Sequence, residues 1–219
     1  MKKLVTATFT VLFLVCAAFA ASAAYYGSDV RYSGLSVMML PLDTADISAK
    51  AGLDMGKSLL LFGGESMSGE RYGWIMGGYA ATGSRRSPGG MPNAELTLSM
   101  GGMILEKIMH HQSTMTFIIG AMAGAGQARL ELVTGPMEKW DDIAKNPTSN
   151  NVSSVFWFVE PYACLRIQVA DFVAAETKIG YSMSMSDGIW KHGNRAVEGT
   201  TRLGIGGPSI TFGVKAGIF

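Results

Sequence analysis

Cysteine, charge and long apolar runs are all scarce in this chain. Only Cys16 and Cys164 are cysteines among its 219 residues, which excludes a disulfide framework and a cysteine-based zinc site. Charged residues make up 16% of the sequence, against roughly 25% in a typical soluble domain. The formal net charge of +1 argues against nucleic-acid binding, which usually shows a basic excess. Beyond the N-terminal segment no apolar run reaches the roughly 18 residues of a transmembrane helix.

The N-terminal segment has the organisation of a secretory signal peptide. Lys2 and Lys3 form a charged start, residues 4–15 form a short apolar core, and small residues follow up to Ala23. We expect cleavage near Ala23, which would leave 24–219 as one exported domain. An uncleaved membrane anchor is the alternative, but the apolar core is short for a membrane span.

The rest of the chain alternates between apolar and small or polar residues, as β-strands with one apolar face do. At the C-terminus, for example, Ile210, Phe212 and Val214 are separated by Thr211 and Gly213. The pattern predicts an all-β fold of about eight antiparallel strands. We place them near 30–40, 57–64, 70–80, 95–106, 114–125, 153–169, 173–185 and 209–219.

The strand count depends on the sixth of these strands. It contains Glu160-Pro161, and a central strand rejects proline, so we expect a bulge or bend at this point. If the strand were split there, the barrel would have more than eight strands.

The connections between the expected strands alternate in length. The long ones span 41–56, 81–94, 126–152 and 186–208, and the short ones span 65–69, 107–113 and 170–172. Short turns at one end and long loops at the other are typical of outer-membrane barrels. The sequence therefore predicts an up-and-down transmembrane β-barrel in a bacterial outer membrane, with long surface loops and both termini in the periplasm.

In such a barrel the apolar residues face lipid and the polar or small ones face the interior. A tight turn at 170–172 would place Arg166 opposite Glu176. The interior of an eight-stranded barrel is narrow enough for side chains to fill, which favours a packed interior over a pore; a larger count would favour a channel. The polar residues expected inside are Glu160, Arg166, Gln168, Glu176, Lys178 and Lys215. The glycines expected inside are Gly101, Gly120, Gly124, Gly180, Gly213 and Gly217.

The C-terminus resembles the insertion signal of bacterial outer-membrane barrels. It reads Thr211-x-Gly213-x-x-Ala216-x-Ile218 and closes on Phe219, which is one step off the apolar register. The mature chain is similar to small proteins of the outer-membrane β-barrel family. The resemblance implies delivery by periplasmic chaperones, insertion by the barrel-assembly machinery and contact with outer-membrane lipid. It implies no particular activity, because this fold serves many roles.

Two alternatives to a non-enzymatic structural or surface protein remain. His111-x-Ser113 resembles the base and nucleophile of the lipid A 3-O-deacylases, which are also eight-stranded barrels. The pair falls in an expected short turn, however, and lipid A lies at the other end. The second alternative is a soluble exported barrel that binds an apolar ligand. The sequence predicts no cofactor and no metal site.

Overall fold

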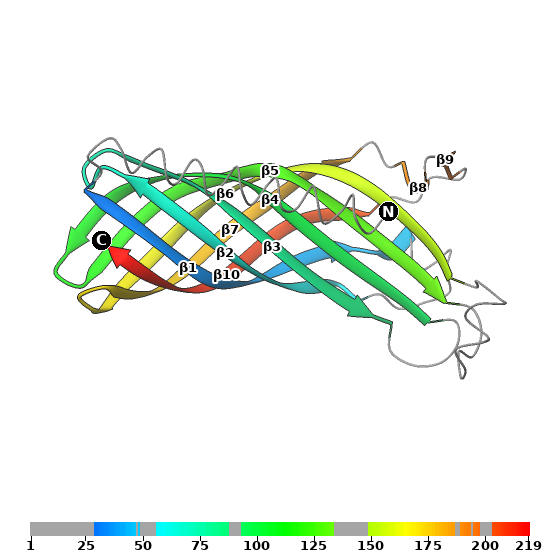
Figure 1. Cartoon of the computed structure of the whole chain (residues 1–219), viewed down its shortest axis with the longest axis horizontal. Coiled ribbons are helices and arrows are strands. Elements are labelled where there is room, and N and C mark those ends of the chain that lie inside the picture. Colours follow the sequence, from blue (N-terminus) through cyan, green and yellow to red (C-terminus); the bar gives the residue numbers. More distant parts are fainter. Residues whose placement is uncertain are drawn as a thin grey trace.

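The computed structural model describes residues 29–46, 48, 56–87, 93–133, 149–186, 189–193, 195–197 and 203–219. The expected signal peptide and its cleavage site near Ala23 lie outside this part of the chain. The described residues form a β-barrel that is elongated along its axis (Figure 1). Among them, no helix is long and apolar enough to cross a membrane.

Eight long strands build the barrel wall, as the alternation predicted. They are β1 (Val30–Asp43), β2 (Ser58–Gly69), β3 (Trp74–Arg86), β4 (Asn93–Gln112), β5 (Met115–Val133), β6 (Ser149–Ala170), β7 (Val173–Ser186) and β10 (Gly204–Ile218). Two short strands, β8 (Lys191–His192) and β9 (Arg195–Ala196), pair with each other, and β8 pairs with β6 at Ser153.

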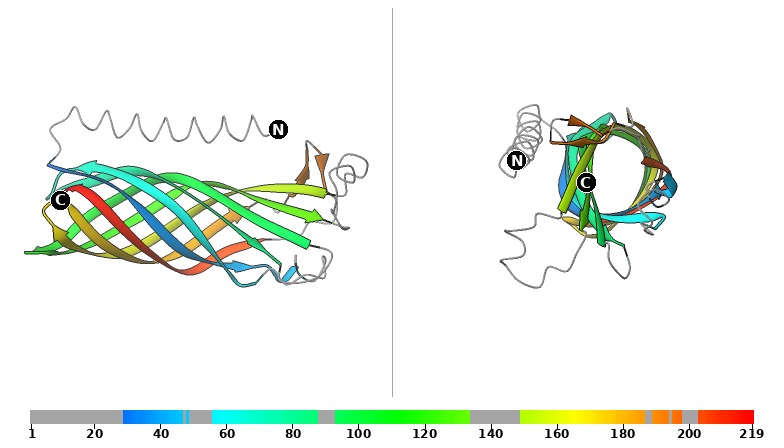
Figure 2. Two further views of the ribbon diagram at one scale, coloured as in Figure 1. Left: turned by 60° about the horizontal axis from the view of Figure 1, so that its bottom comes forward. Right: turned by 90° about the vertical axis from the view of Figure 1, so that its right-hand side faces the viewer.

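Each wall strand pairs antiparallel with its neighbours in sequence, and β1 pairs with β10 to close the circle. The end-on view in Figure 2 shows the closed wall. Closure pairs each of the eight described wall strands on both sides, and pairing of this kind is what allows a β-barrel to span a membrane without exposed backbone polar groups. The predicted all-β, antiparallel, up-and-down barrel of eight strands is confirmed.

The strands are longer than the sequence predicted, because pairing continues beyond the apolar part of the wall. Arg86 pairs with Glu95, and Glu95 with Glu131. The sequence predicts long loops at Arg86 and Glu131. Polar residues end the alternation there, but they do not end the backbone ladder. The wall strands are joined through 44–57, 87–92, 134–148 and 187–203 at one end and 70–73, 113–114 and 171–172 at the other. Figure 1 shows the C-terminus at the end with the short turns.

The bulge expected at Glu160-Pro161 is absent. The pairing of β6 with β5 runs unbroken through Ala121–Pro161, and β6 keeps one register with β7 on both sides of this point. Proline removes one ladder hydrogen bond here without inserting a residue, so the strand is not bent out of register. The irregularity in β6 lies instead between Gln168 and Ala170, next to the turn.

Inward glycines make room for large inward side chains on the neighbouring strand. Gly120 pairs with Tyr162 and Gly126 with Phe156. A Cβ on Gly126 would lie 2.2 Å from the Phe156 ring, and one on Gly120 would lie 2.7 Å from the Tyr162 ring. The inward placement predicted for Gly120 is confirmed. The prediction for Gly101 is wrong, because Gly101 shares the outward register of β4.

The inner face of β4 breaks the expected rule of apolar outside and small inside. Leu96, Leu98 and Met100 are buried in the interior, whereas Met103 and Leu105 on the alternate register are exposed on the outer wall. The long-loop half of this strand is apolar on the inside because it fills the barrel there. Alternation alone could not distinguish the two faces of such a strand.

Candidate functional site

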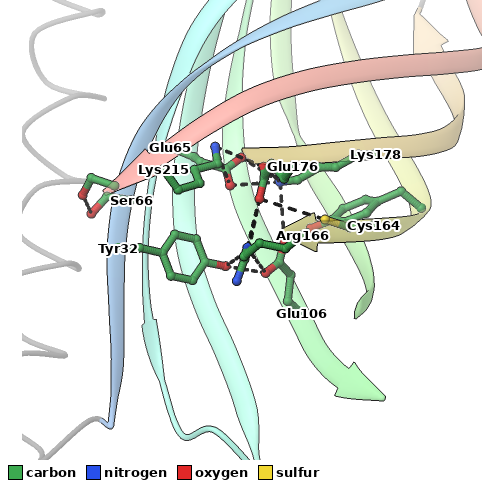
Figure 3. Close-up of polar contacts among 11 residues, drawn as sticks. Tyr32, Glu65, Ser66, Glu106, Cys164, Arg166, Glu176, Lys178 and Lys215 are labelled. Carbon is green, nitrogen blue, oxygen red and sulfur yellow. Dashed lines mark hydrogen bonds and ion pairs between the residues drawn. The ribbon is translucent and has the colours of Figure 1, made fainter. Parts of the chain in front are cut away.

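The most chemically distinctive part of the molecule is a cluster of charges inside the barrel, in the half near the short turns (Figure 3). Its side chains come from β2, β4, β6, β7 and β10, and each is almost completely buried. We call it the charged cluster; its members are Glu65, Glu106, Arg166, Glu176, Lys178 and Lys215.

Each cation of the charged cluster lies against more than one carboxylate. The Arg166 guanidinium is 3.3 Å from Glu106 and 3.1 Å from Glu176. The Lys178 ammonium is 2.8 Å from Glu65, 3.4 Å from Glu106 and 3.3 Å from Glu176. Within the charged cluster, three carboxylates therefore face three cations, and its formal charge is zero.

Lys215 completes the network from the strand that closes the barrel. Its ammonium lies 3.0 Å from Glu65 and 3.1 Å from Glu176. Tyr162 adds a hydroxyl that donates to Glu106 over 2.7 Å. Buried charges are tolerable only when they are paired, and every charge of this network has an ion-pair partner within 3.4 Å. Nζ of Lys215 and Oε1 of Glu176 form ion pairs without a hydrogen bond among the described residues.

Two aromatic rings cover the charged cluster toward the short-turn end. The guanidinium of Arg166 lies 4.0 Å from the centre of the Tyr32 ring and 5.7 Å from that of Phe219. The two rings stack with centroids 5.6 Å apart. Tyr32 also donates its hydroxyl proton to Glu106, and Arg71 donates to the Phe219 carbonyl. The last residue of the chain is thereby held at the mouth of the barrel.

The other half of the interior is filled by apolar side chains, which we call the apolar layer. They come from six strands and include two neighbouring phenylalanines with ring centroids 6.3 Å apart. The apolar layer comprises Leu40, Leu61, Leu96, Leu98, Leu130, Phe156, Phe158 and Ile205. Trp190, between β7 and β8, is buried in the same hydrophobic cluster.

The structure brings together most of the polar residues predicted to lie inside. Arg166 pairs with Glu176 across β6 and β7, as the tight turn predicted. Lys178 and Lys215 join them in the charged cluster, and Glu160 is buried farther along the axis. The remaining candidate, Gln168, is not in the charged cluster. Its amide donates to the carbonyl of Asp171 in the turn, over 3.0 Å.

Sequence reasoning missed Glu65 and Glu106, which are half of the interior carboxylates of the barrel's described part. The sequence predicts Glu65 in the short turn 65–69, because the expected strand 57–64 ends at Gly64. Glu106 shares the inner register of β4 with Leu96 and Leu98, and those leucines were expected to face outward. Continuing the two-residue period of β2 from Gly63 to Glu65 would have found the first of them.

Comparison with solved structures decides the fold. The barrel matches the crystal structure of Neisserial surface protein A (NspA) with a TM-score of 0.51 and 10% sequence identity, over 86% of this chain and 97% of that chain. This chain has the fold of a small bacterial outer-membrane β-barrel. At this identity the match with NspA carries the fold alone.

Ail, the attachment invasion locus protein of Yersinia pestis, matches this barrel as well. Two structures of Ail match this barrel with a TM-score of 0.42 and 13% identity. The first structure covers 87% of this chain. The second, in complex with the heparin analogue sucrose octasulfate, covers 85% of this chain. Both matches include 97% of the Ail chain. No protein-family model matches the sequence. No curated protein matches it either.

The C-terminal residues predicted as an insertion signal are split between the two faces of the barrel wall. Thr211 and Gly213 face inward, whereas Ala216 and Ile218 face outward. Phe219 turns inward onto Arg166, which agrees with its position one step off the apolar register. Their role in insertion stays a prediction.

The catalytic candidates do not form a nucleophile–base pair in this barrel. Nδ1 of His111 lies 2.8 Å from Oγ1 of Thr116 on the facing strand. Ser113 occupies the tight turn between β4 and β5 with a φ of 52°, in the left-handed region. Within the described residues, no group of three or more His, Cys, Asp or Glu side chains could hold a metal ion.

Proposed function

We propose that this protein is inserted in a bacterial outer membrane as a non-enzymatic barrel with a filled interior and a structural or surface role. The observation that carries the proposal is the polarity of the wall, which is apolar outside and charged inside in its short-turn half. Large apolar side chains are exposed on the outer face of every wall strand. A protein that folds in water rarely exposes a contiguous apolar surface of this extent.

The aromatic residues on the outer wall support a membrane position. Trp74 is half-exposed at the short-turn end, with the Lys107 ammonium 5.5 Å from its ring centre, and Tyr72 lies in the adjacent turn. Trp157 and Tyr181 are exposed on the outer wall farther from the short turns. Tryptophan and tyrosine concentrate at the two interfaces of a bilayer, and lysine reaches from there to the headgroups.

A substitution in the wall tests insertion. Arginine at the bilayer midplane costs roughly 2–4 kcal/mol and much less near the interfaces. We expect Ile179→Arg, which is outward and 62% exposed in mid-strand, to reduce the fraction that shows a heat-modifiable gel shift from membranes. Tyr72→Arg, in the exposed turn, is the matched control and should behave like the parent chain. Extraction of the folded parent by carbonate would contradict the proposal and favour the soluble alternative.

The filled interior predicts that the barrel does not conduct ions. The charged cluster and the apolar layer occupy the two halves of the barrel, so we expect no sustained ion conductance in planar bilayers. The charged side chains are linked to one another rather than arranged as a ring around open water. Steady single-channel steps from the purified, folded protein would refute the filled interior.

The orientation is tested with cysteine probes on exposed residues at the two ends. His192, in β8, should be labelled by a membrane-impermeant maleimide on intact cells after substitution to cysteine. Thr114→Cys, in a short turn, should be labelled only after the outer membrane is permeabilised. Cys164 is buried and should not react in the folded barrel. The reverse labelling order would place the long connections in the periplasm.

The absence of enzymatic activity and the assembly route are further parts of the proposal. Expression of the parent chain and of Ser113→Ala should leave the same lipid A mass spectrum. A deacylated lipid A species that depends on Ser113 would establish the enzyme alternative.

Contact with outer-membrane lipid, periplasmic chaperones and the barrel-assembly machinery is expected from the C-terminal pattern. Truncating that pattern should leave the chain in the periplasm.

A further inference from the structure

Glu160 is the interior carboxylate that the charged cluster does not neutralise. The three carboxylates of the charged cluster already match its three cations. Glu160 lies farther along β6, is 1% exposed, and has no ion pair with a described residue within 4.0 Å. A buried carboxylate without a counter-charge is strongly unfavourable. The carboxyl group is therefore neutralised either by a bound cation or by a proton.

The surroundings of Glu160 are hydroxyl groups. Ser209 on β10 donates to Oε1 of Glu160 over 2.7 Å. The carboxylate reaches Ser209 across Gly180, where a Cβ would lie 2.9 Å from Oε1 and 3.0 Å from the Ser209 hydroxyl. Ser182 follows two residues later on the inner face of β7, level with Glu160 between the pairs Val159–Met183 and Tyr162–Gly180.

The second oxygen of Glu160 and two nearby hydroxyls have no partner. Among the residues that the structure describes, no hydrogen bond reaches Oε2 of Glu160, the hydroxyl of Ser182 or that of Tyr79. All three residues are more than nine-tenths buried. Tyr79 comes from the opposite wall, and its ring meets Phe158, the next inward residue of β6, at a centroid distance of 5.9 Å. Buried polar atoms that remain unpaired in a native protein commonly mark a bound ion or water.

We propose that Glu160, Ser182 and Tyr79 bind one monovalent alkali cation inside the barrel. A carboxylate and neutral hydroxyls form an oxygen ligand set of the kind that hard cations prefer. One positive charge balances Glu160, so that the fully buried charges of the described barrel sum to zero. A divalent ion would leave an excess positive charge. The site lies at the boundary between the charged cluster and the apolar layer.

Thermal unfolding of the full chain, folded in detergent micelles, tests the site. The midpoint is measured in choline chloride, NaCl and KCl at one ionic strength, since choline is too large for a buried site. A ligand that binds only the folded state stabilises it in proportion to the logarithm of its concentration. We expect a saturable rise of roughly 3 °C in at least one alkali salt over choline, a shift typical of a modest ligand in a chain of this size.

Three variants locate the effect. Glu160→Gln keeps the shape of the side chain and should abolish the difference between alkali salts and choline. Ser182→Ala should raise the cation concentration needed for half of the rise by about tenfold or more. Glu131→Gln is the matched control on the outward register of β5, and it should retain the full effect. If Glu160→Gln does not fold, broadening of the ²³Na resonance by the parent chain, reduced in Ser182→Ala, provides the same test.

Two results would overturn the proposal. Equal midpoints in all three salts would mean that no alkali cation binds. A protonated-carboxyl stretching band in the infrared spectrum of the parent chain, absent from Glu160→Gln, would mean that a proton neutralises Glu160. Neither result bears on membrane insertion, which is tested separately through Ile179.

Discussion

The two halves of the barrel interior are filled differently, although buried apolar side chains such as Met67, Ile75 and Ile118 also lie in the short-turn half. In the short-turn half, the charged cluster joins five strands through ion pairs at 2.8–3.4 Å. In the long-loop half, the apolar layer fills the same width by packing alone. The comparison teaches that a narrow barrel does not need a polar interior. It needs an interior whose groups satisfy one another, either as paired charges or as close-packed hydrocarbon.

The two fillings respond differently to substitution. Removing one member of a charge network leaves its partners buried without a counter-charge in a low-dielectric interior. Removing apolar atoms leaves only a cavity. The charged half should therefore be less tolerant of single changes. Four substitutions test this difference, and each is measured by urea unfolding of the protein folded in vesicles, followed through tryptophan fluorescence.

The largest effect is expected for Arg166→Met. This change leaves Glu106 and Glu176 without the guanidinium that lies within 3.3 Å of both. Breaking a buried pair by removing one partner costs about 3–5 kcal/mol. Combining Arg166→Met with Glu106→Gln should recover part of the lost unfolding free energy, because one of the two unpaired buried carboxylates is then removed. A loss below that of Leu98→Ala would reverse the ranking of the two halves.

Leu98→Ala should have the next largest effect. Leu98 is fully buried in the apolar layer, and its truncation should lower the free energy of unfolding by about 2–4 kcal/mol. Leu60→Ala provides the control, because Leu60 is 51% exposed on the outer wall and its removal leaves no interior cavity. Its loss should be clearly smaller. Equal losses at the two positions would show that the apolar layer is not close-packed.

Phe219→Ala should have an intermediate effect of about 1–2 kcal/mol, from the lost ring stack on Tyr32 and the lost contact with Arg166. Phe219→Tyr keeps both contacts and should be close to the parent chain in stability. To separate stability from assembly, both variants are compared after refolding in vitro, where the insertion machinery is absent. An unchanged stability of Phe219→Ala would restrict this residue to a role in insertion.

The smallest effect is expected for Arg86→Gln. Arg86 pairs with Glu95 over 3.0 Å on the outer surface, and its side chain is 81% exposed. Exposed ion pairs contribute about 0–1 kcal/mol and are screened by salt. A loss comparable to that of Arg166→Met would show that burial is not what distinguishes the charged cluster.

The sequence predicted the barrel wall better than its contents. Alternation gave the strand number and the faces of β6, β7 and β10, because charged residues mark the inner face of those strands. It failed on β4, where Leu98 inside and Leu105 outside are both apolar. It also ended the strands too early, because polar positions such as Arg86 still pair through the backbone.

The candidate site was predicted in part for the same reason. Arg166 and Glu176 are close in sequence across a tight turn, so their pairing follows from local register. Glu65 and Glu106 reach the same cluster from strands far away in the chain. A period of two can place a side chain on one face of a strand, but it cannot say which distant strands that face will meet.

By itself the sequence determined that the chain forms antiparallel strands with distinct faces, since side-chain period and turn lengths are local properties. Only the tertiary structure decided how the interior is divided, because closing β1 onto β10 brings Lys215 to Glu65 on β2. Closure also leaves Glu160 outside the charge balance, among hydroxyls from three strands. Those contacts depend on the circumference of the barrel and the stagger of its strands, which no single segment encodes.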